Sequence, residues 1–397
     1  MAMTRRRRAP GSLNAGRGRQ KRPTSVGRAS RAAPGSGKAN TQGNRNGFSL
    51  GYQHGHWQGL CEATIARASQ VHEKRPFKVL YVTSGKGYPY SPLDEGIHHS
   101  LLEVADSVIL ASPKDDAASV AEAQRPDLVL VLDGMDFPAA QVDRIRGLGI
   151  RTAIWFTDDP YYTDITSALA PHYDRVFTLE RNCVPYYQSL GCARVHNLPL
   201  AVYPGYYRTR NPRMALRGDV AFIGTAYWNR VKLFHELLPR LESKRFRLSG
   251  LWWDRLPDYD RWRSRIDLGK WMTPIDTAEC YNANRIVINV HRAHDDETFN
   301  RNSAGIPAVS PNPRTFEIAA CGTLQIVDGR DDLAQYYEPG REIVTYDSPG
   351  QLADLIDYYL THEEERQQIA LRALYRTMRD HSFASRLTQL IDLAMEP

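Results

Sequence analysis

The first fifty residues contain no aspartate or glutamate, and nowhere does the 397-residue chain hold a long apolar run. Such a run would be needed for a membrane span or a secretion signal, so the sequence predicts neither and we expect a cytoplasmic protein. The first acidic residue is Glu62, whereas residues 1–50 carry twelve arginines and lysines. Beyond them, 39 basic face 45 acidic residues, so the formal net charge of +6 becomes −6 for residues 51–397. A nucleic-acid partner is therefore not expected apart from this basic segment.

Residues 1–50 also have few apolar side chains and many Gly, Ser, Pro and Asn. A segment of this composition buries too little apolar surface to offset the entropy of ordering it. We predict a disordered basic tail. It either binds an anionic polymer or surface or serves as a solubilising or localising arm, and the sequence favours the arm.

Cysteine is scarce, and its spacing excludes two common site classes. The five cysteines show no C-x-x-C pair, so neither a zinc site nor a disulfide framework is indicated, and we expect reduced thiols. His54 and His56 lie close in sequence but lack a further ligand at metal-binding spacing. A short helix that docks Trp57 on a domain surface is the preferred interpretation of this segment. No metal and no cofactor are expected.

Short apolar runs alternate with helix-length polar stretches over most of the chain, which is typical of parallel sheets covered on both faces. The runs are 78–83, 108–111, 128–132, 152–157, 175–179 and 195–198, then 219–223, 246–251, 286–290, 324–327 and 342–346. We therefore predict an α/β protein with two Rossmann-like doubly wound domains facing a cleft. The expected boundaries are a tail at 1–50, a helix at 51–73, a first domain at 74–203, a linker at 204–217, a second domain at 218–380 and, at 381–397, a helix packing back on the first domain.

Ligands bind such sheets at the carboxyl ends of the strands, so the polar residues there are the site candidates. In the first half these are Ser84 to Gly87 with Tyr88 and Tyr90, which lack the G-x-G-x-x-G fingerprint of dinucleotide sites, and the adjacent pair Asp158 and Asp159. One carboxylate of that pair would serve as a general base with a pKa tuned by the other. The alternative is that the pair caps the following helix.

In the second half, Gly224 and Thr225 follow a strand and lead into a helix that carries Arg230 and Lys232. Backbone amides and the helix dipole favour a phosphate at such a place. Asn289 and His291 lie at the end of the 286–290 strand.

The segment Asn312 to Asp328, N-P-R-T-F-E-I-A-A-C-G-T-L-Q-I-V-D, combines a short helix, a Cys-Gly turn and a buried strand. Arg314 and Glu317 are one helical turn apart and share a face. A guanidinium there suits a diphosphate and a carboxylate suits the two hydroxyls of a ribose. The alternative is a surface ion pair that contributes only ~0.2–0.5 kcal/mol.

Five stretches together resemble the CgeB-like family of glycosyltransferases, which have the GT-B architecture of two facing Rossmann-like domains. They are residues 78–94, W-F-T-D-D-P-Y at 155–161, D-V-A-F-I-G-T at 219–225, I-N-V-H-R at 288–292 and N-P-R-T-F-E-I-A-A-C-G at 312–322. The resemblance runs from about Gly51 to the C-terminus. In retaining enzymes of this architecture a Glu four residues before the Cys-Gly pair holds the ribose, which implies that role for Glu317. A second Glu usually lies eight residues earlier, and here Val309 stands there, so the stereochemistry stays open.

The resemblance implies transfer of a sugar from a nucleotide donor to a spore-surface glycan or protein, without a metal, on the mother-cell side and in association with spore-coat proteins. The residues expected at the donor are Gly224, Thr225, Arg230, Lys232, Asn289, His291, Arg314, Glu317 and Gly322. Ser84, Tyr88, Tyr90 and Asp94 are expected at the acceptor, and Asp158 and Asp159 are the catalytic candidates. A non-catalytic spore-coat component that kept the fold, with a structural or carbohydrate-binding role, is the alternative.

Overall fold

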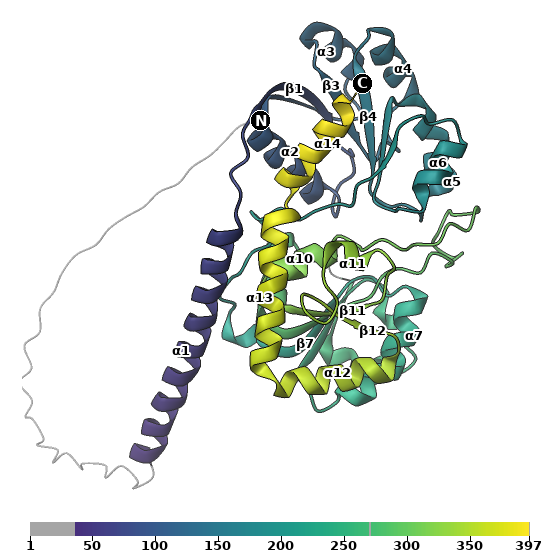
Figure 1. Ribbon diagram of the computed structural model, residues 1–397. Coiled ribbons are helices and arrows are strands. Elements are labelled where there is room, and N and C mark those ends of the chain that lie inside the picture. Colours follow the sequence, from purple (N-terminus) through teal and green to yellow (C-terminus); the bar gives the residue numbers. More distant parts are fainter. Residues whose placement is uncertain (1–35, 270, 397) are drawn as a thin grey trace, which may run out of the picture. The chain divides into compact units, whose positions relative to one another are not determined.

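The computed structural model describes residues 36–269 and 271–396, and it contains two parallel six-stranded sheets (Figure 1). The strands are β1 (Arg75–Val82), β2 (Ala105–Ala111), β3 (Leu128–Leu132), β4 (Arg151–Phe156), β5 (Arg175–Thr178), β6 (Val195–Asn197), β7 (Gly218–Ile223), β8 (Phe246–Gly250), β9 (Ile266–Leu268), β10 (Asn284–Asn289), β11 (Leu324–Asp328) and β12 (Val344–Tyr346). The α-helices are α1 (Ser36–Ala68), α2 (Ser91–Val104), α3 (Ala117–Gln124), α4 (Ala139–Gly147), α5 (Thr163–Leu169), α6 (Cys183–Ser189), α7 (Trp228–Leu237), α8 (Tyr259–Trp262), α9 (Pro274–Ala283), α10 (Arg314–Ala320), α11 (Leu333–Tyr336), α12 (Pro349–Thr361), α13 (Glu363–Asp380) and α14 (Phe383–Met395).

The first lobe is built on a sheet with the strand order β2-β1-β3-β4-β5-β6. Every residue of β3, with the sequence L-V-L-V-L, is buried, because helices cover both faces of the sheet. The strand order reverses between β1 and β3, and β3 pairs with β4 in register from Leu128 opposite Arg151. Polar residues that follow these strands therefore lie at a topological switch point, where α/β sheets bind their ligands.

The second lobe has the order β12-β11-β10-β7-β8-β9, so its switch point lies between β7 and β10. All eleven strands predicted from the apolar runs are present, which confirms the two doubly wound sheets. β9 was not predicted: it has three residues, of which only Ile266 is buried, so the sequence shows no apolar run there.

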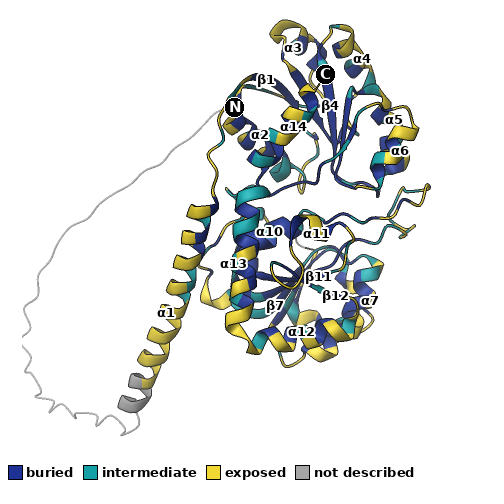
Figure 2. Ribbon diagram, in the orientation of Figure 1, coloured by how far each residue is buried: buried dark blue, intermediate teal, exposed yellow. Residues whose placement is uncertain are grey.

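Figure 2 shows both sheets coloured as buried, and the outer surfaces of α12 and α13 as exposed. One cluster of buried apolar side chains fills the second lobe between its sheet and α7 and α12, and two clusters lie on opposite faces of the first sheet. α14 belongs to the first lobe, although it follows the second in sequence, because its apolar residues Leu387, Leu390 and Ile391 lie in the core that includes α2. Ser382 begins α14 by accepting the backbone N–H of Ser385.

The first helix starts earlier than the sequence analysis expected. Residues 36–50 were assigned to the tail, but α1 runs without a break from Ser36 to Ala68. The chain has no proline between Pro34 and Pro76 to stop a helix, and its many glycines weaken helix propensity without forbidding it. Residues up to Tyr52 form one unit and residues 53–397 another. Residues 1–35, where disorder was predicted, lie outside the described part of the chain.

Within the second unit, the later part of α1 is packed. Cys61 and Ala68 are buried and Trp57 is half-buried, all in a cluster with apolar side chains of α10 and α13. This agrees with the expected docking of Trp57. All five cysteines are buried and unpaired, as predicted.

Candidate nucleotide-sugar site

A pocket of about 410 Å³ is lined by residues of both lobes. The first lobe contributes Tyr88, Pro89, Tyr90, Pro92 and Leu93, then Thr157 and Asp158 after β4, and Leu200, Ala201, Tyr203 and Phe383. The second lobe contributes Gly224 and Thr225 after β7, Gly250 after β8, Trp271, Met272, Pro274, Thr277, Tyr281 and the start of α10. Because both sets follow the carboxyl ends of parallel strands, the pocket lies where this fold class binds ligands.

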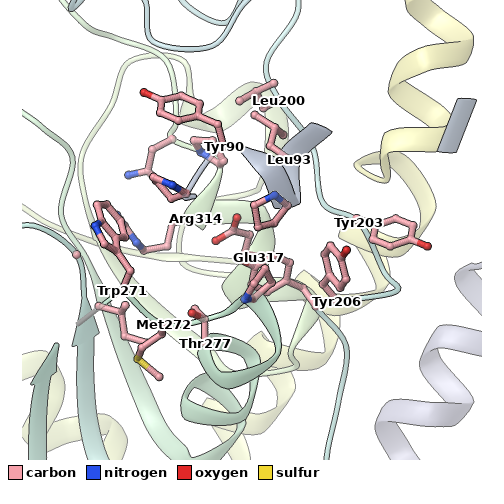
Figure 3. A pocket seen from close by; sticks show the side chains of 18 of the residues that line it. Tyr90, Leu93, Leu200, Tyr203, Tyr206, Trp271, Met272, Thr277, Arg314 and Glu317 are labelled. Carbon is pink, nitrogen blue, oxygen red and sulfur yellow. The ribbon is translucent and has the colours of Figure 1, made fainter. Parts of the chain in front are cut away.

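The start of α10 presents one charged face to the pocket. Pro313 precedes the helix, and the side chain of Asn312 accepts the backbone N–H of Thr315 at 3.2 Å. Thr315 and Phe316 face the core, whereas Arg314 and Glu317, one turn apart, both line the pocket (Figure 3). The side chains that the sequence placed together therefore share one wall.

Gly224 brings the backbone of the β7–α7 turn close to two guanidinium groups. A Cβ atom at this position would lie 3.1 Å from Nη1 of Arg230 and 3.1 Å from Nη2 of Arg314. In the described part of the chain, neither guanidinium forms an ion pair with a carboxylate. A half-buried backbone turn with the Arg314 guanidinium beside it and the Arg230 guanidinium behind it forms a cradle for an anion.

Arg230 lies behind this cradle rather than in the pocket lining. It is buried and donates to the backbone oxygen of Val290 at 2.8 and 3.1 Å and to that of Thr225 at 2.9 Å. Burial, and then the charge of Arg314, lower the pKa of Arg230 to about 9. The guanidinium stays protonated at neutral pH. It fixes the β7–α7 turn by its hydrogen bond to Thr225 and places a positive charge behind that turn.

The carboxyl group of Glu317, which lines the pocket, has a raised pKa. Burial raises the pKa of its carboxyl group to about 7, while the Arg314 guanidinium and the Tyr207 hydroxyl act in the opposite direction. A ligand that donates hydrogen bonds to the ionised carboxylate would lower this pKa again.

His291 and Asn289 were expected to contact the nucleotide-sugar donor, but both are buried and neither lines the pocket. Their contacts instead indicate that they position other residues. Nδ1 of His291 lies 2.7 Å from the Asp328 carboxylate, and Nε2 accepts the backbone N–H of Asn312 at 3.0 Å. This requires a neutral ring protonated at Nδ1, and burial lowers the pKa of His291. Asn289 bonds the Asn312 amide at 3.0 Å and accepts from Arg314 at 3.4 Å. Together they fix the start of α10.

Only one member of the adjacent aspartate pair reaches the pocket. Asp158 lines it and accepts the Tyr90 hydroxyl at 2.8 Å. Asp159 is buried on the other side, where Thr178 donates to it at 2.6 Å and Tyr187 at 2.8 Å. The catalytic expectation for Asp159 is corrected to a structural one, because in the turn after β4 its carboxylate is held by the hydroxyls of Thr178 and Tyr187.

Four further candidates also lie away from the pocket. Ser84 and Asp94 are buried and bonded to each other, with Oγ of Ser84 2.6 Å from the Asp94 carboxylate. Lys232 is exposed on α7, outside the pocket. Gly322 ends α10 with φ +66°, and a Cβ there would lie 3.1 Å from Sγ of Cys61, so this glycine serves the turn into β11. Tyr88 and Tyr90 do line the pocket.

The sequence analysis missed most of the aromatic lining. These residues are Tyr203, Tyr206, Tyr207, Tyr227, Trp271, Tyr281 and Phe383. Several of these aromatic residues lie in the interdomain linker or in loops, where apolar residues do not recur at helix or strand spacing. The only sequence signal for a site was the number of aromatic residues in these segments.

No helix among the described residues is long and apolar enough to cross a membrane. No group of three or more His, Cys, Asp or Glu side chains among them is arranged to hold a metal ion.

Comparison with known proteins agrees with this geometry. Residues 230–392 match a family model described as glycosyl transferase-like. Spore protein CgeB of Bacillus subtilis is 30% identical over 295 residues, which cover 74% of this chain and 91% of that protein. The chain belongs to the CgeB-like family of glycosyltransferases.

Solved structures show the same fold as this CgeB-like chain at low sequence identity. HepE of Anabaena, in complex with UDP-glucose, is 10% identical and has a TM-score of 0.55, over 80% of this chain and 98% of that one. A glycosyltransferase from Rickettsia africae is 12% identical with a TM-score of 0.55, over 81% and 98% of the two chains. These likenesses confirm the GT-B fold.

Proposed function

We propose that this protein transfers a sugar from a nucleoside diphosphate to the hydroxyl group of an acceptor. The observation that carries the proposal is the convergence of Arg230 and Arg314 on Gly224, with Glu317 one turn further along α10. The diphosphate would lie against Gly224 and Arg314, and the Glu317 carboxylate would accept the two ribose hydroxyls. HepE, which shares the fold, was solved with UDP-glucose, and this supports the class of donor.

In the reaction, the acceptor oxygen forms a bond to the anomeric carbon while the bond from that carbon to the diphosphate breaks. The diphosphate leaves with the electron pair, and the guanidinium groups stabilise the negative charge that it gains. Asp158 would take the proton of the acceptor hydroxyl in an inverting reaction. A retaining reaction needs no protein base at that point. The proposal needs no divalent ion, since Arg314 and Arg230 supply positive charge, and EDTA should therefore leave donor binding unchanged.

Our proposal for the acceptor and for the location of the protein rests on the name of its relative. Spore protein CgeB is named as a spore protein, and we extend this to a glycan or protein of the spore surface as the acceptor. Spore-coat proteins on the mother-cell side are the partners that this location implies.

Calorimetric titration with a panel of nucleoside diphosphates tests the proposal. One of them should bind, and Arg314→Ala should weaken its binding about 10- to 100-fold, because a charge-assisted hydrogen bond contributes about 1.5–3 kcal/mol. Lys232→Ala is the matched control, since it removes a nearby charge that lies outside the pocket, and it should bind like the wild type. Slow hydrolysis of the corresponding nucleotide sugar should accompany binding. If no nucleoside diphosphate binds, the proposal fails and the non-catalytic coat component takes its place.

A further inference from the structure

The first-lobe wall of the pocket is aromatic and apolar. We define this wall by Tyr90, Leu93, Leu200, Tyr203, Tyr206 and Phe383 together with Asp158. Figure 3 shows Arg314 and Glu317 between Tyr90, Leu93 and Leu200 on one side and Trp271, Met272 and Thr277 on the other. Tyr203 and Tyr206 lie beside Glu317, on the side away from Trp271.

This wall offers no positive charge to a ligand. Among the described lining residues, Arg314 is the one cation, and it belongs to α10 and the proposed diphosphate cradle. Lys86 is the nearby cation of the first lobe, but its Nζ lies 2.6 Å from the buried Asp133 carboxylate and 4.6 Å from the centre of the Tyr90 ring. Lys86 is therefore already neutralised behind the wall. An anionic acceptor would lose its hydration here without gaining a counter-charge.

Asp158 supplies one unused acceptor atom. Its Oδ2 accepts the hydroxyl of Tyr90 at 2.8 Å and lies 3.4 Å from the Thr157 hydroxyl. Its Oδ1 accepts no hydrogen bond from any described residue, and the side chain lines the pocket. Tyr227, from the β7–α7 turn of the second lobe, lines the same pocket as Asp158. A ligand hydroxyl on the wall can therefore donate to Oδ1 beside the donor cradle.

The combination of aromatic faces with one carboxylate suits a sugar better than a peptide. The C–H face of a pyranose packs against tyrosine rings, and its hydroxyls donate to a carboxylate. An extended peptide instead adds to a free sheet edge through main-chain hydrogen bonds. The wall lies at strand carboxyl ends, and Pro89 and Pro92 beside it have no N–H to donate.

We propose that this wall is an acceptor subsite for an uncharged sugar, whose hydroxyl donates to Oδ1 of Asp158 while its apolar face packs on Tyr90, Tyr203 or Tyr206. This inference rests on the proposed function, since it names the second substrate of the same site. The wall selects neutral sugars over uronic acids because it has an acidic group and no free cation.

Saturation-transfer NMR with the full chain, saturated with the nucleoside diphosphate that calorimetry selects, tests the subsite. The probes are matched methyl glycosides that differ only at C6: glucose against glucuronic acid and galactose against galacturonic acid. A serine-containing peptide is the third probe. We expect at least one neutral glycoside to bind about tenfold more tightly than its uronic acid, because an unpaired carboxylate is costly to desolvate.

Two variants sharpen the result. Tyr206→Ala should weaken the neutral glycoside without changing nucleoside diphosphate affinity. Leu93→Lys, at a half-buried position on the wall, should raise the binding of the uronic acid relative to the neutral sugar. Tighter binding of the uronic acid or the peptide by the wild type, or no glycoside binding to the nucleotide-saturated protein, overturns the subsite and leaves the donor proposal standing. Failure of the nucleotide itself to bind overturns the donor proposal.

Discussion

The carboxylate of Glu180, after β5 in the first lobe, accepts the backbone N–H of Val309 in the second lobe at 3.0 Å. The same oxygen accepts the N–H of Ser310 at 3.0 Å, and the other oxygen accepts that of Asn182 at 3.1 Å. Val309 is the position at which the resemblance led us to expect a second glutamate. A buried carboxylate does lie at this point of the chain, but it comes from the other lobe and holds the backbone of the segment that leads into α10.

Glu180→Ala should therefore lower the free energy of unfolding by about 3 kcal/mol, because it leaves buried backbone N–H groups without an acceptor. Glu180→Gln keeps one acceptor oxygen and should have an intermediate effect. Urea-induced unfolding measures both. The control is Glu297→Ala, in the exposed part of the same β10–α10 connection, which should change stability little. Equal stability of Glu180→Ala and the control would show that the bond between lobes does not contribute.

Gly224→Ala separates binding from folding. Its Cβ would lie 3.1 Å from both guanidinium groups and from the buried Phe222 ring, and would displace Arg314 from the place proposed for diphosphate binding. We expect nucleoside diphosphate affinity to fall by at least about tenfold, while the thermal unfolding temperature falls much less than in a variant with a backbone clash. Gly250→Ala is the contrasting variant: Gly250 has φ +144°, and its Cβ would lie 2.2 Å from the oxygen of Gly224, so it should destabilise the protein strongly. Wild-type affinity in Gly224→Ala would place the diphosphate elsewhere.

Asp159 should make stability depend on pH. Burial raises the pKa of its carboxyl group to about 7 in the folded chain, against an ordinary value near 3.8. Well below pH 3.8 the carboxyl group is protonated in both states; as the pH rises to 7, the unfolded chain ionises while the folded chain keeps most of its proton. The contribution to stability is therefore present at low pH and lost towards pH 7, about 4 kcal/mol in all.

Asp159→Asn cannot ionise at this position. The stability of the variant relative to the wild type should therefore be higher at pH 8 than at pH 5. Urea unfolding at the two pH values measures the difference. Infrared spectroscopy provides an independent readout: the protonated-carboxyl band of the wild type at pH 6 should be weaker in Asp159→Asn, where the protonated carboxyl of Glu317 remains. A pH-independent difference between the two proteins would contradict the proton held at Asp159.

The sequence by itself determined the two parallel sheets and the pairing of Arg314 with Glu317. Both depend on local rules: apolar runs of strand length bury both faces of a parallel sheet, and residues three apart on a helix share a face. The edge strand β9 was missed because only Ile266 of its three residues is buried, so the sequence has no apolar run there.

Tertiary structure decided which polar strand-end residues meet a ligand. Asp158 and Asp159 are neighbours in the turn after β4, yet one faces the pocket, where it accepts the Tyr90 hydroxyl, and the other faces the core, where it accepts the Tyr187 hydroxyl. The aromatic first-lobe wall, the burial of Arg230 behind Gly224 and the bond from Glu180 to Val309 join residues from separate elements. No local pattern encodes such distances, so only the folded chain shows them.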